Sequence, residues 1–493
     1  MPPFLIILIA VLFLLVAFVL IRTLLFTRAS AASRLPFDAD LPALDLDPAV
    51  AARHLSEAIK IKTISHEEPA QNDRSKWLEL HRQLEKDFPR LHAALKREVL
   101  DGYSLLYTWP GSNPELEPVC FMAHQDVVPA DETTLDQWTH PPFSGLIDEE
   151  FIWGRGTLDI KCQLISTMEA VEALLANGYQ PERTILLAFG HDEEVLGTGA
   201  KRIVAHLQEQ GIRLQSVIDE GGGVYDGIIP GVRGYSASVG VAEKGYLSLK
   251  FTVKAHGGHS STPAPQTAIG ILARALDRLQ THQFPYKVKA VLPLFKGLGQ
   301  SASPLMQVAF ANLWLFSGIV RRKLIASNNT AATIHTTTAP TIFHSGVKDN
   351  VLPSLAEAVV NFRILPGETI AEVCDRIRKV IADERVTFEP LRGNAWEASP
   401  VSPTDAVAYR HISSVVDELF PGTATAPFVM LGGTDARNYY AISSQVYRFC
   451  PVLVTKEDIA RVHGVNERLS IAGLATMIEF FYRLVPRWAS REM

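Results

Sequence analysis

One long apolar run opens the chain, and two different rhythms of apolar and polar residues follow it. Residues 4–21 read FLIILIAVLFLLVAFVLI and contain no polar side chain. A run of about 18 to 20 apolar residues is long enough to cross a bilayer as a helix. Further along, short apolar runs alternate with segments in which apolar residues recur every three or four positions. The short runs predict buried strands, and the recurring pattern predicts amphipathic helices.

The first rhythm predicts an α/β fold. Strand-like and helix-like segments alternate between residues 118 and 219. Such alternation is typical of a largely parallel sheet flanked by helices. Ligands bind beyond the carboxyl ends of the strands in sheets of this kind, so polar residues at those ends are candidates for a site. The expected strands are residues 118–124, 183–190 and 214–219, and the expected helices are residues 165–178 and 199–211.

A second rhythm begins near Glu243 and has the order βαββαβ, which predicts an inserted α+β lid domain. An apolar segment, residues 283–325, interrupts it. Its apolar content is too high for a solvated loop, so we expect a packed helical insertion or a hydrophobic surface. The expected strands are residues 246–255, 336–346, 357–365 and 386–390, and the expected helices are residues 266–280 and 369–382.

These patterns predict five consecutive units. They are a transmembrane anchor or uncleaved signal at residues 1–27, a tether at 28–46, the first part of the α/β domain at 47–242, the inserted α+β lid domain at 243–398, and the second part of the α/β domain at 399–493.

The amino-terminal run has two interpretations. No Lys or Arg precedes it, whereas a signal peptide usually opens with a basic segment; yet ASAAS at Ala29–Ser33 offers small residues for cleavage. The length of the run favours an anchor. Arg22, Arg28 and Arg34 follow the span, which places that flank in the cytoplasm, while an exported enzyme would require the reverse. We therefore expect a protein that is either anchored in a membrane by one span or exported. The sequence does not fix the orientation of the span across the membrane.

Composition and charge exclude several classes of protein. The chain has 493 residues, of which 47% are hydrophobic and 20% charged, so a sizeable buried core is expected. The net charge of -6 and the lack of a long basic stripe argue against nucleic acid as a partner. The cysteines lack CxxC spacing, which argues against a thiolate zinc site and a dense disulfide framework. They are Cys120, Cys162, Cys374 and Cys450.

Candidate metal ligands occur where the predicted strands end. His124 and Asp126 in HQD face the same way on an extended segment, so Asp126 can fix the orientation of the imidazole. Asp159 in GRGTLD precedes a helix and by itself is explained equally well as an N-cap. His463 lies in a polar loop ahead of another helix, and by itself is a surface residue. None of these motifs is specific alone.

The segment HDEE, residues 191–194, carries three consecutive acids behind an apolar run. Three carboxylates there repel one another unless a cation or a shared proton relieves them, so a metal site is the simpler explanation. IDEGGG repeats the pattern with Asp219 and Glu220. Imidazoles and carboxylates without thiolate suit zinc, with manganese or cobalt as alternatives, and such sets are the usual basis of two-metal hydrolases.

The ordered motifs resemble the co-catalytic zinc peptidase family of aminoacylase and carboxypeptidase S. Within it they look most like carboxypeptidase S and N-fatty-acyl-amino-acid synthase/hydrolase. The resemblance covers nearly all of the chain after the tether. The motifs are HQD, GRGTLD, HDEEVLGTGA, IDEGG, HGGHSSTP, GVKDNVLP, FRILPG, GGTDAR and HGVNERL.

The resemblance implies a role for each matching residue. Two Zn²⁺ ions would be bound by His124, Asp159, Glu194, Glu220 and His463. Asp159 would bridge them, and Asp219 is the alternative to Glu220. Glu193 would be the general base, Asp126 would orient His124, and His259 would stabilise the oxyanion, in some members across a dimer interface. The implied substrate contacts are Asn350, Arg363 and Arg437, although a structural ion pair explains either arginine equally well.

We therefore expect a hydrolase that reversibly cleaves the amide bond of N-acyl amino acids, N-fatty-acyl amino acids included. The alternative is a carboxypeptidase S-like enzyme that acts on short peptides. Residues 283–325 would line an acyl pocket or meet the bilayer near the anchor. An esterase or lactonase is a further alternative. A binding protein on the same scaffold is disfavoured because a pure ligand site does not need the base Glu193.

Overall fold

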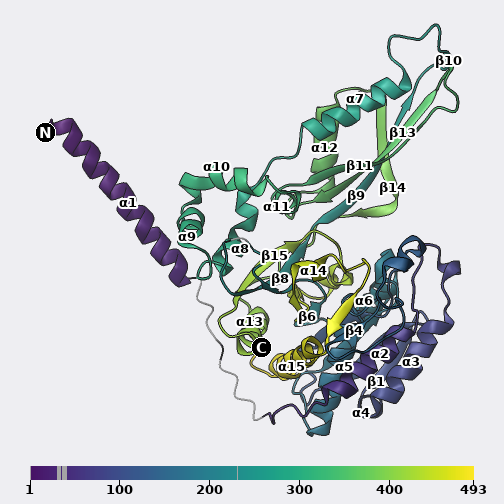
Figure 1. The fold of residues 1–493 in the computed structure, drawn as a ribbon, viewed down its shortest axis with the longest axis vertical. Coiled ribbons are helices and arrows are strands. Elements are labelled where there is room, and N and C mark those ends of the chain that lie inside the picture. The colour runs from purple at the N-terminus through teal and green to yellow at the C-terminus, as the bar shows by residue number, and fades with distance from the viewer. Residues whose placement is uncertain (1, 30–34, 36–40, 230) are drawn as a thin grey trace.

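A ten-stranded mixed sheet forms the centre of the larger body in the computed structural model, which describes residues 2–29, 35, 41–229 and 231–493 (Figure 1). Its order is β1-β2-β5-β3-β6-β16-β8-β7-β17, and β15 pairs with β8. The pairs β3/β5, β3/β6, β16/β6, β15/β8 and β17/β7 are parallel. The strands are β1 (Lys96–Leu100), β2 (Ser104–Trp109), β3 (Val119–His124), β5 (Ile185–Gly190), β6 (Ser216–Asp219), β7 (Gly223–Asp226), β8 (Tyr235–Glu243), β15 (Ala424–Met430), β16 (Val446–Arg448) and β17 (Leu453–Val454).

Helices cover both faces of this sheet. Phe121 of β3 packs into the core formed with α2, α5, α13 and α15, whereas its neighbours Cys120 and Met122 pack into a second core with α6 and the 3₁₀ helix η5. Successive side chains of β3 therefore pack on opposite faces of the sheet, and helices cover both faces. This arrangement confirms the predicted α/β fold. The helices are α2 (Pro48–Lys60), α3 (Ser75–Asp87), α4 (Pro89–Ala94), α5 (Lys161–Ala176), α6 (Gly199–Glu209), α13 (Val407–Leu419), α14 (Lys456–Ile459), α15 (Ile471–Ala489) and η5 (Asp435–Ala441).

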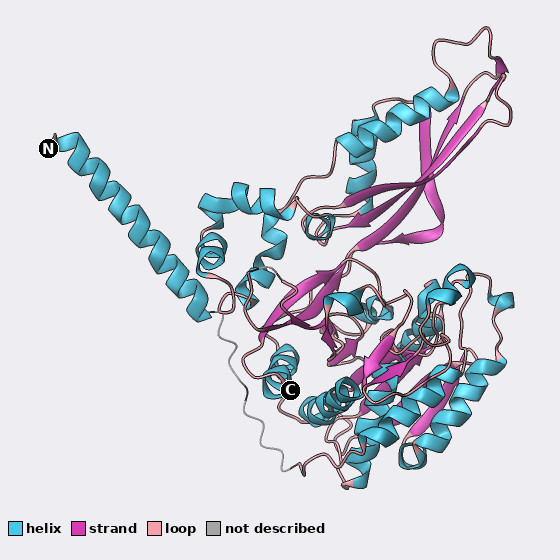
Figure 2. Ribbon diagram, viewed as in Figure 1, coloured by secondary structure: helices cyan, strands magenta, loops and turns pink. Residues whose placement is uncertain are grey.

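A four-stranded antiparallel sheet projects from this body (Figure 2). Its elements follow in the order β9-α7-β11-β13-α12-β14, which is the predicted βαββαβ order, and both helices pack on one buried face. They are β9 (Gly245–Lys254), α7 (Ala268–Thr281), β11 (Thr337–Ser345), β13 (Leu355–Ile364), α12 (Ile370–Ile381) and β14 (Val386–Trp396). The short pair β10 (Gly258–His259) and β12 (Val351–Leu352) forms its far tip. The exact domain boundaries stay predictions.

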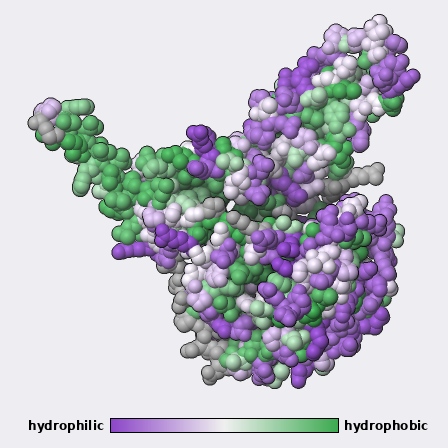
Figure 3. Space-filling model, viewed as in Figure 1, coloured by the Kyte–Doolittle hydropathy of each residue, from purple (hydrophilic) through white to green (hydrophobic). Residues whose placement is uncertain are grey.

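The apolar interruption is helical. Its elements are η4 (Val288–Val291), α8 (Leu292–Gly297), α9 (Pro304–Ala311) and α10 (Leu313–Leu324), and the short helix α11 (Asn328–Ala332) follows it. Phe295 and Phe310 stack in a small core of its own, with ring centroids 3.7 Å apart. Other apolar side chains of the insertion face outward beside α1 (Figure 3). Both expected features, packed helices and a hydrophobic surface, are therefore present.

The amino-terminal run forms α1 (Pro3–Ala29). The most apolar 18-residue window within Pro3–Arg28 has a mean hydropathy of 3.6, and none of this window is buried. By length and composition the helix is compatible with a signal anchor or a signal peptide. Most of the predicted tether, and residues 30–34 with most of the small-residue stretch, lie outside the described residues.

Candidate metal centre

The carboxyl ends of three adjacent parallel strands carry most of the predicted ligands. His124 is the last residue of β3, and Glu220 follows β6 directly. Glu193 and Glu194 come just after β5. Because β3 pairs in parallel with both β5 and β6, these ends meet at one edge of the sheet. This is the edge at which α/β sheets bind ligands.

Asp159 lies between the two candidate histidines. Its Oδ1 is 3.3 Å from His124 Nε2, and its Oδ2 is 3.0 Å from His463 Nε2. His124 Nε2 also lies 3.6 Å from Glu220 Oε1, and His463 Nε2 lies 3.1 Å from Glu194 Oε2. Each histidine nitrogen thus lies near Asp159 and one glutamate, which is Glu220 for His124 and Glu194 for His463.

Asp126 holds two parts of the cluster in place. Its Oδ1 lies 3.3 Å from His124 Nδ1, as predicted, and its backbone carbonyl lies 3.0 Å from the same nitrogen. The backbone N–H groups of Glu193 and Glu194 donate to its two carboxylate oxygens, at 3.1 Å each. Ser65 Oγ donates to it at 2.6 Å. Asp126 therefore orients an imidazole and fixes the loop that carries two acids.

The remaining acids of the two motifs have other partners. Asp192 accepts the backbone N–H groups of Thr198 and Gly199 at 2.8 Å each, so it caps the start of α6. Asp219 Oδ2 accepts the N–H of Ala436 at 2.8 Å. Of the two alternatives in IDEGG, Glu220 is therefore the one whose carboxylate faces His124.

Sequence reasoning missed the residue pair that supports Asp159. Glu467 is fully buried; its Oε1 accepts the N–H groups of Gly156, Leu158 and Asp159 at 2.9, 2.8 and 3.2 Å. Its Oε2 accepts from Arg155 Nη1 at 2.6 Å. Both residues lie inside motifs noticed in the sequence, GRGTLD and HGVNERL, but spacing alone does not reveal that these motifs join.

The cluster carries more negative than positive charge in a buried place. Burial raises the pKa of Glu193 and Glu220 well above the ordinary value, and nearby carboxylates add to the shift. Hydrogen bonds to Asp159 and Glu194 raise the pKa of His463 to about 10. Burial opposes protonation of His124, but Glu220, Asp126 and Asp159 outweigh it and raise its pKa. These four shifts retain protons, which a bound cation would replace, whereas the two histidines lower the pKa of Asp159 and keep it ionised.

The donor atoms fit a divalent cation. Ligand atoms of His124, Asp159 and Glu194 lie within 4.8 Å of one another, and so do those of His124, Glu193 and Glu220. Glu194 Oε1 is buried without a hydrogen-bond partner among the described residues, although a carboxylate oxygen ordinarily has one. Imidazole nitrogen with carboxylate oxygen suits zinc.

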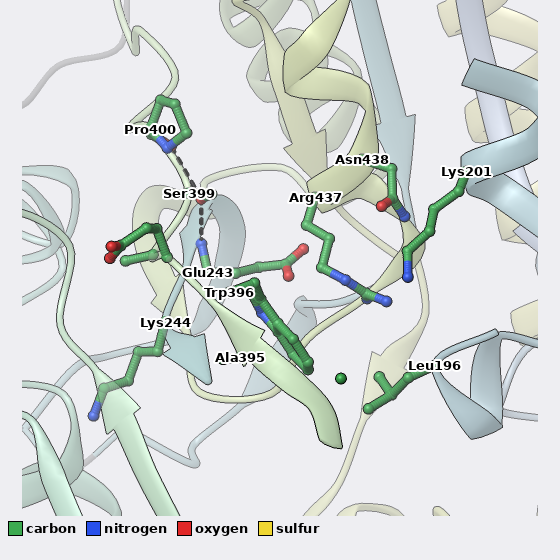
Figure 4. A pocket seen from close by; sticks show the side chains of 13 residues that line it. Leu196, Lys201, Glu243, Lys244, Ala395, Trp396, Ser399, Pro400, Arg437 and Asn438 are labelled. Atoms are coloured by element: carbon green, nitrogen blue, oxygen red, sulfur yellow. Dashed lines mark hydrogen bonds between the residues drawn. The ribbon is translucent and has the colours of Figure 1, made fainter. Parts of the chain in front are cut away.

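Two cavities adjoin the cluster. One of about 280 Å³ is lined by Asp159, Glu193, Glu194, Glu220 and His463 of the cluster. Its apolar wall consists of Leu158, Ile160, Met430, Val452, Leu453, Val454 and Val462. The other, of about 480 Å³, is shown in Figure 4, where the side chains of Arg437, Lys201 and Trp396 reach into it. Gly433 lines the first cavity, and a Cβ atom there would lie 3.7 Å from Arg437 Nη1 of the second. The cavity that Arg437 lines therefore begins beside the cluster.

The two predicted arginines belong to one stack of side chains. Arg437 lies over the ring of Trp396 at 5.0 Å, and Trp396 stacks on Tyr246 at 4.6 Å. Arg363 lies over the other side of this pair, 4.5 Å from the Tyr246 ring. Only Arg437 of the two lines the cavity. The stack joins the projecting sheet to the 3₁₀ helix η5, which carries Arg437.

His259 and Asn350 are not brought to the cluster within this chain. They lie at the exposed far tip of the projecting sheet, where the backbone N–H of Ser260 donates to the carbonyl of Asn350 (Figure 1). His259 Nδ1 accepts from Ser261 Oγ at 2.7 Å. In this conformation neither residue reaches the cavities of the same chain.

Comparisons with known proteins identify a matching family and similar sequences. A model of peptidase family M20/M25/M40 matches residues 120–487. The N-fatty-acyl-amino acid synthase/hydrolase PM20D1 of Homo sapiens is 39% identical over 438 residues, covering 87% of this chain and 86% of that protein. The probable carboxypeptidase S-like 2 of Dictyostelium discoideum is 38% identical over 439 residues, covering 88% and 84%.

Two solved structures share the fold. The M20 family metallo-carboxypeptidase Sso-CP2 from Sulfolobus solfataricus superposes with a TM-score of 0.63 at 16% identity, covering 89% of this chain and 99% of that one. Human carnosine dipeptidase 1 superposes with a TM-score of 0.61 at 15% identity, covering 90% and 97%.

Proposed function

Because the chain belongs to peptidase family M20/M25/M40 and is therefore a metal-dependent hydrolase, we propose that it hydrolyses N-acyl amino acids, N-fatty-acyl amino acids included. The observation that carries this proposal is the position of Asp159, with one carboxylate oxygen toward each histidine. A carboxylate so placed is suited to bridging two ions. The reaction is reversible in principle, so the same site would join a fatty acid to an amino acid where both accumulate.

Two Zn²⁺ ions, or Mn²⁺ or Co²⁺ in their place, are the proposed cofactors. The first would be held by His124, Asp159 and Glu220, and the second by Asp159, Glu194 and His463. When bound, the ions would polarise the scissile carbonyl and acidify the attacking water. Asp126 keeps Nε2 of His124 turned toward the cluster by engaging its other ring nitrogen.

Glu193 is the proposed general base. Its side chain is buried beside the cluster, and its backbone is fixed by Asp126. Glu193 takes a proton from water as the water oxygen attacks the amide carbon. It then donates that proton to the nitrogen as the carbon–nitrogen bond breaks, which leaves a fatty acid and a free amino acid.

Arg437 is the proposed contact for the carboxylate of the amino acid. Its guanidinium is held by the carbonyl of Thr434 at 2.5 Å and by the face of Trp396, so it is oriented before substrate arrives. A planar guanidinium binds a carboxylate through two parallel hydrogen bonds. The apolar wall of the first cavity suits the acyl side of the amide. Arg363 acts through the stack and is proposed as a positioning residue.

His259 and Asn350 are proposed to serve the site of a second copy. Their exposed position at the far tip supports a homodimer formed through the projecting sheet, in which His259 would stabilise the oxyanion of the partner's substrate. The helix α1 is proposed to be retained as a single membrane anchor, because its apolar stretch is longer than a signal peptide requires.

One screen tests the substrate class and the metal together. Purified protein is assayed on N-acetyl amino acids, N-oleoyl amino acids and dipeptides, and the metal content of the same sample is measured. We expect the N-acyl amino acids to be the better substrates and about two zinc ions per chain. Faster hydrolysis of dipeptides would instead support the carboxypeptidase alternative, which relatives named carboxypeptidase S-like favour. Matched ester substrates separate the esterase alternative.

The variant Glu193→Gln tests the mechanism. It keeps the shape of the side chain but removes its basicity, so metal content should persist while kcat falls by about 10²-fold or more. Asp192→Asn is the matched control, because the carboxylate of Asp192 accepts the N–H groups at the start of α6. Full activity of Glu193→Gln would eliminate this residue as the base.

A further inference from the structure

The helices α9 and α10, residues 304–324, present an apolar surface to the outside; we call these two helices the collar. Leu305, Trp314 and Ile319 are 80%, 52% and 63% exposed. In Figure 3 this surface is continuous with the apolar surface of α1. Exposed apolar patches of this kind mark contact with a protein or a membrane.

Polar contacts fasten the collar to α1. The guanidinium of Arg22 donates to the carbonyl of Ala311 at 3.3 and 3.4 Å. Asn312, at the corner between α9 and α10, donates to the carbonyl of Val19 at 3.3 Å and to Thr23 Oγ1 at 3.2 Å. The corner of the collar therefore lies at the level of residues 19–23 of α1.

The length of α1 sets the depth of that corner. Trp314 contacts Phe18 edge to face at 6.0 Å, so the part of α1 ahead of these contacts is Pro3–Ala17. At about 1.5 Å per residue this free part is about 22 Å long. The hydrocarbon core of a bilayer is about 30 Å thick. A spanning α1 must therefore bring part of its collar-bound segment, and with it the collar, to bilayer depth.

Basic residues follow apolar residues along both α10 and α1. The exposed Arg321, Arg322 and Lys323 lie at the end of α10, after its apolar residues, and Arg22 and Arg28 follow the apolar part of α1. Basic side chains beside an apolar surface match the phosphates of lipid headgroups, and tryptophan is enriched at the same boundary.

We propose that the collar is a second membrane-contacting element, whose partner is a phospholipid bilayer with anionic headgroups. Leu305, Trp314 and Ile319 lie among the upper acyl chains, and the basic end of α10 lies at the phosphates. With α1 and the collar both engaged, the catalytic body is held in one orientation at the bilayer instead of swinging from a tether. This inference rests on the proposed retention of α1.

Fluorescence quenching in vesicles tests the collar directly. The full chain with Cys374→Ser, which leaves the buried Cys120, Cys162 and Cys450, receives Ile319→Cys for labelling with an environment-sensitive fluorophore. Leu78→Cys is the matched control, because Leu78 is 45% exposed and belongs to α3, which lies far from α1 in Figure 1. Both proteins are reconstituted in vesicles of phosphatidylcholine with phosphatidylserine.

We expect acyl-chain quenchers to reduce the emission from position 319 several-fold more than that from position 78, and aqueous iodide to do the opposite. Equal quenching of the two positions by iodide would overturn the proposal. Protection of position 319 from both quenchers would also overturn it, because a second copy of the chain would then cover the collar.

Two further measurements separate the collar from the anchor. Replacing Arg321, Arg322 and Lys323 by Gln should remove the part of the acyl-chain quenching that depends on phosphatidylserine. Intact mass of the membrane-purified protein shows whether α1 is retained. If α1 is absent, the anchor proposal fails. Flotation of that shorter protein with the same vesicles then tests the collar by itself. Binding to the vesicles would support the collar proposal, and a lack of binding would overturn it.

Discussion

Replacing Glu467 by Gln should weaken both the fold and the metal centre, although Glu467 is not a proposed ligand. Its carboxylate accepts three backbone N–H groups through Oε1 and the guanidinium of Arg155 through Oε2, and it is fully buried. Gln keeps one acceptor oxygen, but its amide NH₂ then faces Arg155. A buried guanidinium is left without its anion.

The size of the effect follows from burial. Breaking a buried ion pair by removing one partner costs about 3 to 5 kcal/mol. At about 2.1 cal/mol/K per residue, a cooperative unit of several hundred residues then melts about 3 to 6 °C lower. The loop from Gly156 to Asp159 also loses its support, so zinc affinity should fall by about 10- to 100-fold, as for other groups that orient metal ligands.

Glu182→Gln is the matched control. Glu182 pairs with Arg491 at 2.7 Å, which is close to the Arg155–Glu467 distance, but the two side chains are 35% and 73% exposed. An exposed pair contributes about 0 to 1 kcal/mol. Differential scanning fluorimetry and a competitive zinc-chelator titration measure the two variants side by side. If Glu467→Gln melts and binds zinc as Glu182→Gln does, the assigned support of Asp159 is refuted.

Three further outcomes follow from single contacts. Asp192→Ala should cost about 1 kcal/mol of stability by removing the cap of α6, with zinc content unchanged, as measured by denaturation and metal analysis. Trp396→Leu should raise KM for N-acyl amino acids about 2- to 5-fold with kcat unchanged, because Arg437 loses a cation–π contact, and a fall in kcat alone would contradict this. Burial lowers the pKa of Lys244 from 10.5 to about 7, so above pH 7 unfolding takes up a proton and the free energy of unfolding rises toward pH 10. Lys244→Met should flatten that rise in urea titrations, and an unchanged slope would exclude Lys244 as its source.

The α/β fold and the members of the cluster were predictable because both depend on local pattern. A buried strand that ends in a histidine or an acid places that residue at a known edge of the sheet, which is why His124, Glu194 and Glu220 were found together. The support of Asp159 was not predictable. Glu467 lies more than 300 positions from Asp159 along the chain, and only tertiary packing turns its carboxylate toward those N–H groups.

The residues at the tip of the projecting sheet show what sequence motifs could not predict. HGGHSS and GVKDN predicted two side chains near substrate, yet the structure places both segments at the exposed tip, because β10 and β12 form a short antiparallel ladder there in which His259 pairs with Val351. A sequence motif indicates the role of a residue in the assembled enzyme. The structure of one chain shows only the position of that residue within the same chain. The stack from Arg363 through Tyr246 and Trp396 to Arg437 joins the same sheet to the cavity that Arg437 lines. A change in the angle of the projecting sheet would therefore shift Arg437, which is the proposed contact for the substrate carboxylate.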